Sequence, residues 1–142
     1  DLIKTGMVVT SDIAEKNDIH PANKQDVGKR LARLALSNDY EKSEFLSSGP
    51  LYMKQKIFKS YIDLYFDYNG TGLMAKRKLK DFEIASEDQN FHPAYATIID
   101  DKVRVSSKKV VNPKFVRYGW KNYFDASLFN KEGLPASSFR TP

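Results

Sequence analysis

The sequence predicts two structural parts: an α/β edge unit over residues 1–45 and an all-β sandwich or jelly-roll-like domain over residues 46–142. Apolar residues recur at helical spacing in the first part, whereas they alternate with polar residues in the second. The change of period falls in the serine- and glycine-containing stretch 43–50. With 142 residues, of which 41% are hydrophobic, the chain is long enough for one such core and a smaller piece.

The first part is predicted to contain a strand over residues 6–10 and a helix over residues 23–40. The apolar residues that define one face of this helix are Val27, Leu31, Leu34 and Ala35. The residues expected on its polar surface are Lys24, Lys29, Arg30 and Arg33. A lone strand has no neighbour for its backbone amide and carbonyl groups, and a lone helix has little to pack on. We therefore expect this βα unit to be the edge of a larger domain.

The second part shows the two-residue period of half-buried antiparallel strands. Apolar and polar side chains alternate over residues 62–68, and further strands are predicted over residues 82–85 and 115–120. Residues 97–99 and 103–105 flank a polar turn, which is typical of a short hairpin. Many short strands separated by turn residues favour a β-sandwich or a jelly roll.

The loop between the predicted strand and helix, Asn17-Asp18-Ile19-His20-Pro21, carries the candidate catalytic residues. Loops at the carboxyl ends of strands are where α/β enzymes place their chemistry. A histidine accepts a proton near neutral pH, and a nearby carboxylate can hold its ring in one tautomer. The pattern indicates a general base, His20, that is oriented by Asp18.

Four segments of the chain carry a resemblance to a known family. They are Thr5-Gly6-Met7-Val8-Val9-Thr10-Ser11-Asp12, residues 23–32, Arg117-Tyr118-Gly119-Trp120 and residues 128–141. With the His-Pro pair, these segments resemble the sialate O-acetylesterase family of SGNH-type serine hydrolases. The resemblance implies that residues 1–45 are the last strand and helix of an SGNH hydrolase domain, followed by an accessory β-sandwich. It also implies an esterase whose substrate is an O-acetylated sialic acid, in an exported protein that is periplasmic, secreted or lysosomal.

The serine nucleophile that such an esterase needs is not recognisable in the chain. No Gly-x-Ser-x-Gly, Gly-Asp-Ser or Gly-Gln-Ser pattern occurs, and Ser11 and Ser48 lack that context. In the family the nucleophile lies far upstream of the histidine block. By this resemblance the chain is a carboxyl-terminal portion whose partner is the upstream hydrolase segment, and we expect it to be inactive alone.

The sequence offers three candidates for the residue that orients His20. In the SGNH pattern an Asp stands three positions before the His, and Asn17 occupies that position here. An Asn can fix a tautomer, but it cannot stabilise the imidazolium by charge, and exchanging Asp for Asn in a serine triad costs about 10⁴ in rate. We therefore prefer Asp18, with Asp12 as the third choice.

Composition argues against several other classes of protein. The net charge of +5 could suit nucleic acid, but basic residues are dense only over residues 76–80, which we expect to be an exposed connection. No apolar run approaches the roughly 20 residues that cross a bilayer. The chain has no cysteine and two distant histidines, His20 and His92. We therefore expect no nucleic acid or membrane among its partners, and no metal or cofactor.

The alternative function is a non-catalytic β-sandwich module that binds carbohydrate or protein. The faces of Trp120, Tyr118 and Tyr123 suit the apolar faces of sugar rings. Aromatic residues in a β-domain more often belong to the core. A serine-nucleophile block in the encoded upstream sequence would favour the enzyme over the binding module.

Overall fold

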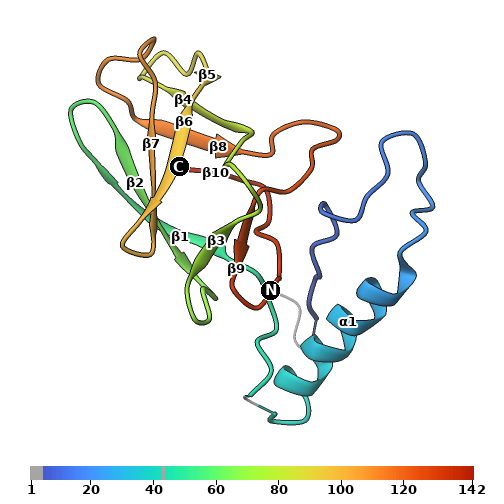
Figure 1. The fold of residues 1–142 in the computed structure, drawn as a ribbon. Helices are drawn as coiled ribbons and strands as arrows, with labels where there is room; N and C mark the ends of the chain where they lie inside the picture. The colour runs from blue at the N-terminus through green and yellow to red at the C-terminus, as the bar shows by residue number, and fades with distance from the viewer. Residues whose placement is uncertain (1–4, 43) are drawn as a thin grey trace.

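The computed structural model describes residues 5–42 and 44–142, which contain one helix and ten strands (Figure 1). The helix is α1 (Lys24–Asn38). The strands are β1 (Leu51–Ile57), β2 (Ile62–Asp67), β3 (Leu73–Ala75), β4 (Phe82–Ala85), β5 (His92–Pro93), β6 (Tyr95–Ile99), β7 (Lys102–Ser106), β8 (Phe115–Tyr118), β9 (Leu128–Asn130) and β10 (Phe139–Arg140).

The strands form two four-stranded antiparallel sheets, in the orders β1-β2-β7-β6 and β10-β8-β4-β5, and a two-stranded sheet of β3 and β9. One core joins the two larger sheets, because the inward side chains of β2 and β7 belong to the same buried cluster as those of β4 and β8. Phe139 of the second sheet packs against Tyr52 and Phe66 of the first, with ring centroids 5.2 Å and 5.6 Å away. The prediction of a β-rich domain is confirmed.

Strands with a clean alternation lie where the sequence predicts them. β2, β4 and β8, and the hairpin of β6 and β7, fall within or close to the predicted ranges. Five strands, β1, β3, β5, β9 and β10, are additional to the prediction. β1 is an edge strand whose register shifts between Tyr52 and Lys54, and this irregularity interrupts its period of two.

The predicted strand over residues 6–10 is wrong, because the structure has no strand there. The guanidinium of Arg30, rather than a neighbouring strand, forms hydrogen bonds with this segment. Arg30 Nη1 donates to the Val9 carbonyl oxygen at 2.6 Å and to Asp12 Oδ1 at 2.7 Å, and Nη2 donates to Asp12 Oδ2 at 2.6 Å. Arg30 is therefore buried, with 8% exposure, and does not lie on the polar surface as expected.

The helix forms as predicted, within two residues at its carboxyl end. Asn23 caps its first turn by accepting from the Asp26 amide at 3.1 Å. The expected apolar face is only partly covered: Leu34 packs on Gly6, whereas Leu31 remains 49% exposed. In Figure 1 the helix lies to one side of the sheets.

The predicted unit over residues 1–45 includes residues 1–4 and 43, which lie outside the described part of the chain. Its assignment to the edge of an SGNH domain, and its boundary with residues 46–142, stay predictions. Residues 48 and 49, just after the predicted boundary, are anchored on the rest of the β-domain. The fully buried side chain of Asn130 donates to the Ser48 carbonyl oxygen at 3.2 Å, and Gly49 packs directly on the backbone of Pro135.

Candidate functional site

The loop that carries His20 is exposed and held by local hydrogen bonds. Asp18 Oδ1 accepts from the backbone amide of His20 at 2.7 Å, and Glu15 Oε1 accepts from the Ala22 amide at 2.8 Å. The structure therefore brings Asp18 and His20 together, but through the His20 backbone. Within residues 5–42 and 44–142, no side chain is hydrogen-bonded to the His20 imidazole.

The two other orienting candidates differ from Asp18 in their surroundings. Both carboxylate oxygens of Asp12 are taken by Arg30, and the side chain of Asp12 is only 10% exposed. Asp12 thus has a structural partner. Asn17 lies on the exposed part of the loop. The other histidine, His92, lies in β5, where it pairs with Ile84 of β4.

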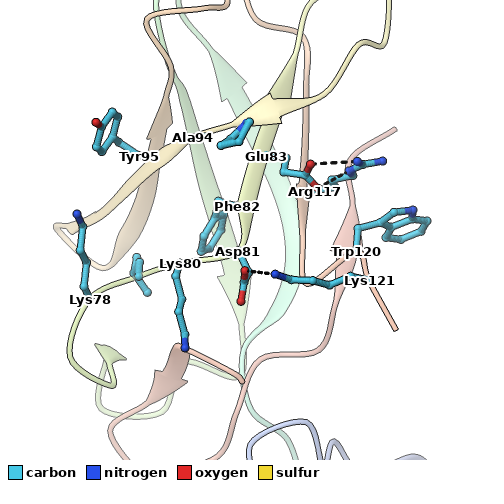
Figure 2. Close-up of a pocket in the computed structure, with 12 residues that line it drawn as sticks. Lys78, Lys80, Asp81, Phe82, Glu83, Ala94, Tyr95, Arg117, Trp120 and Lys121 are labelled. Atoms are coloured by element: carbon cyan, nitrogen blue, oxygen red, sulfur yellow. Dashed lines mark hydrogen bonds and ion pairs between the residues drawn. The ribbon is translucent and has the colours of Figure 1, made fainter. Parts of the chain in front are cut away.

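A second candidate site is a groove of about 490 Å³ on the β-domain. It is lined by parts of three segments: residues 78–83, residues 93–95, and Arg117 with Trp120 and Lys121. Figure 2 shows Lys78 and Tyr95 on one side of this groove and Trp120 on the other. Such a volume lies within the range of small-ligand sites in proteins.

The turn at Gly119 places Trp120 at the rim of the groove. Gly119 has a φ of +61°, and a Cβ added there would lie 2.5 Å from the Phe124 ring, so the turn requires a glycine. The Gly119 amide donates to the Asp81 carbonyl oxygen at 3.0 Å, which holds the turn against the residue before β4. Trp120 is therefore fixed by its backbone, although its side chain is 51% exposed.

Two ion pairs fix four of the six charged side chains of the groove. Arg117 donates from Nε to Glu83 Oε2 at 2.8 Å and from Nη2 to Glu83 Oε1 at 3.1 Å, and its guanidinium lies 4.2 Å from the Phe91 ring centroid. Lys121 pairs with Asp81. These contacts present donors and acceptors in set positions, which is what a polar ligand needs for specific binding.

Lys78 differs from the other cations of the groove. Lys80 pairs with Asp125 at 3.1 Å, and Arg117 and Lys121 have the partners given above. Across the described ranges, no carboxylate lies within ion-pair distance of Lys78, whose ammonium sits 5.7 Å from the Tyr95 ring centroid. Its charge is therefore available to a ligand.

The sequence grouped Trp120 with Tyr118 and Tyr123 as stacking candidates, but the structure separates them. Tyr118 is fully buried, and its hydroxyl accepts from the Ser127 amide at 2.9 Å and the Leu128 amide at 3.2 Å, so it belongs to the core. Tyr123 does not line the groove. The groove itself escaped sequence reasoning because its walls come from separate segments. The available signal was a lone tryptophan directly after a glycine.

The part of the chain that the structure describes contains neither a metal-binding cluster nor a membrane-spanning helix. There, no cluster of three or more His, Asp or Glu side chains has the arrangement of a metal site. The same residues include no helix with the length and apolar character that crossing a bilayer requires.

Comparison with known proteins shows a similarity to a solved structure. No protein-family model matches the chain, and no curated protein matches it. Among solved structures, a carbohydrate acetylesterase from Xanthomonas citri is similar, with 41% sequence identity and a TM-score of 0.86. The match covers 92% of this chain and 31% of that protein, so this chain spans about a third of its length.

Proposed function

We propose that this chain is the carboxyl-terminal portion of a serine esterase that removes O-acetyl groups from sialic acids. The observation that carries the proposal is the similarity to a carbohydrate acetylesterase, at 41% identity over 92% of the chain. The choice of sialic acid within carbohydrate esters depends on the resemblance of the His-Pro pair and of residues 128–141 to the sialate O-acetylesterase family. From the same resemblance we propose that the protein is exported, which cell fractionation tests.

His20 is the general base in this proposal. It takes the proton of a serine hydroxyl as the serine attacks the acetyl carbonyl, and it returns a proton to the departing sugar oxygen. The exposed position of His20 leaves its ring open to a nucleophile from another part of the protein. Asp18 Oδ1 accepts from the His20 amide, which keeps the two residues close together. In this proposal, the Asp18 carboxylate orients the His20 ring in the complete protein.

The partner that brings the nucleophile is the upstream hydrolase segment of the same protein. Apolar side chains at the surface of the amino-terminal part support this docking. They include Ile19 at 90% exposure, Met7 at 70% and Leu31 at 49%. Burying one such side chain contributes about 1.5 to 3 kcal/mol, so a covering domain would stabilise this part considerably.

The test compares the two histidines in the complete protein, with an O-acetylated sialic acid as substrate. His20→Ala should lower kcat by about 10² to 10⁴ with little change in KM, because proton transfer acts in the transition state. His92→Ala is the matched control and should retain activity. Equal, small losses in both variants would remove His20 from the mechanism.

The orienting residue is tested in the same protein. Asp18→Asn should lower kcat, and Asn17→Ala should lower it less. The opposite order would assign the orienting role to Asn17 and would show that the spacing of the SGNH pattern holds in this chain.

A module that binds carbohydrate or protein without catalysis is the second candidate function. The groove beside Trp120 favours it, because it is preformed and shares no residue with the His20 loop. A complete protein that binds glycan but hydrolyses no acetyl ester would support this candidate over the esterase.

A further inference from the structure

We propose that the groove between Trp120 and Lys78 binds an acidic sugar of a glycan. One ring of the glycan stacks on the face of Trp120 at one side of the groove, and the ammonium of Lys78 at the other side pairs with the carboxylate of an acidic sugar in the same glycan. The chemistry is that of a sialic acid or a uronic acid. This proposal goes beyond the esterase function and does not need it, since no lining residue of the groove comes from the segment that carries His20.

The exposure of Trp120 is the first support. It is the one tryptophan of the chain, and half of its surface is open to water although the core contains many smaller aromatic and aliphatic side chains. The Gly119 turn and the Phe124 ring beneath it impose this position. A rigid, exposed aromatic face loses little conformational entropy when it takes up a ligand.

The walls of the groove match both the apolar faces and the polar hydroxyl groups of a sugar. Phe82 and Leu79 provide a buried apolar floor, and Tyr95 on the far side is 65% exposed. The paired side chains of Glu83 with Arg117 and of Asp81 with Lys121 offer oxygen acceptors and nitrogen donors near the ring. Sugar hydroxyls both donate and accept, so they can bind such mixed pairs without breaking them.

The charge of the groove favours an acid over a neutral sugar. Its lining contains four cations, Lys78, Lys80, Arg117 and Lys121, and two carboxylates, Asp81 and Glu83. Three of the cations have carboxylate partners, whereas Lys78 has a contact with the Tyr95 ring. A ligand carboxylate would therefore pair with Lys78 without displacing an existing partner.

The single tryptophan makes the binding directly measurable. The 142-residue chain is titrated with sialyllactose, with a glucuronate-containing disaccharide and with lactose, while the fluorescence of Trp120 is followed. At least one acidic sugar should bind saturably and about two- to fivefold more tightly than lactose, which is the scale of one exposed ion pair. This preference should shrink between about 0.01 M and about 1 M salt.

Variants assign the two contacts. Lys78→Gln should lower the affinity for the acidic sugar to the affinity for lactose. Lys59→Gln, at an exposed lysine outside the groove, should leave the affinity for the acidic sugar unchanged. Trp120→Ala should weaken binding of every sugar by roughly five- to tenfold in a calorimetric titration, and the exposed Tyr40→Ala should leave it unchanged. Circular dichroism and the unfolding midpoint show that each variant is folded.

Three results would overturn the proposal. They are no saturable sugar binding to the folded chain, equal affinity for acidic and neutral sugars, and tighter binding of a short single-stranded oligonucleotide than of any sugar. The comparison of sialyllactose with the glucuronate disaccharide distinguishes the two sources of carboxylate. If these titrations show no sugar binding, the esterase proposal still stands. If His20→Ala leaves the activity of the complete protein unchanged, the proposal for the groove still stands.

Discussion

Arg30 and Asp12 form a two-pronged ion pair that attaches α1 to the segment before it, with N–O distances of 2.7 Å and 2.6 Å. Both side chains are about nine-tenths buried. Each charge is therefore poorly hydrated, and each depends on the other for compensation. This pair, together with the Arg30 contact to the Val9 carbonyl oxygen, takes the place of the sheet pairing that was expected there.

Removing Asp12 should release the amino-terminal part. Asp12→Ala leaves the Arg30 charge buried without its partner, which costs about 3 to 5 kcal/mol. Hydrogen exchange should then accelerate in α1 and leave the strands of the β-domain unchanged. Lys29→Ala, which removes an exposed pair on the same helix, is the control and should have a much smaller effect. Unchanged exchange in α1 after Asp12→Ala would contradict the anchoring role.

Asp63 should make the β-domain sensitive to acid. The hydrogen bonds from Arg104, at 2.8 Å and 2.9 Å, hold the pKa of the Asp63 carboxyl below its ordinary value, against the opposing effect of burial. Because the pKa is lower in the folded state, this stabilisation is present above the unfolded pKa of about 3.9 and is lost as the pH falls through the folded pKa. Urea unfolding from neutral to acid pH should show a flatter profile for Asp63→Asn. The exposed Asp67→Asn is the control, and an unchanged profile in Asp63→Asn would contradict the prediction.

Substitutions at two glycines with positive φ measure the cost of backbone strain alone and the cost of strain with steric overlap. Gly133→Ala, at a φ of +82° with open space around it, should cost about 1 to 2 kcal/mol for the left-handed conformation alone. Gly119→Ala adds the clash with the Phe124 ring and should cost more, and it should disturb Trp120. Chemical denaturation with tryptophan fluorescence measures both effects. Equal free energies of unfolding for the two variants would show that Phe124 moves aside freely.

The strands that the sequence predicted place one face in the common core. β2, β4 and β8 alternate cleanly because one face of each lies in the common core. β1 was missed because its edge position and shifted register relax that alternation. The apolar stretch 6–10 has strand-like composition, but a strand also needs a partner, and local sequence does not report whether one is present.

The candidate site was predictable only where its residues are adjacent in the chain. Asp18 and His20 share a loop, so the sequence alone placed them together. The burial of Arg30 depends on a residue 18 positions away, and the groove depends on three separate segments. Tyr118 and Trp120 show the same limit, since the turn at Gly119 turns Trp120 outward while Tyr118 stays in the core.

The most direct measurement of the central claim is hydrolysis of p-nitrophenyl acetate by this chain with and without the upstream hydrolase segment. Alone, the chain should not exceed free imidazole at the same concentration, because it supplies a base and no activated nucleophile. Adding the separately prepared upstream segment should restore turnover with the wild-type chain and with His92→Ala, and should fail with His20→Ala. Turnover by the chain alone that a serine-directed phosphonate abolishes, or full restoration by His20→Ala, would contradict the claim.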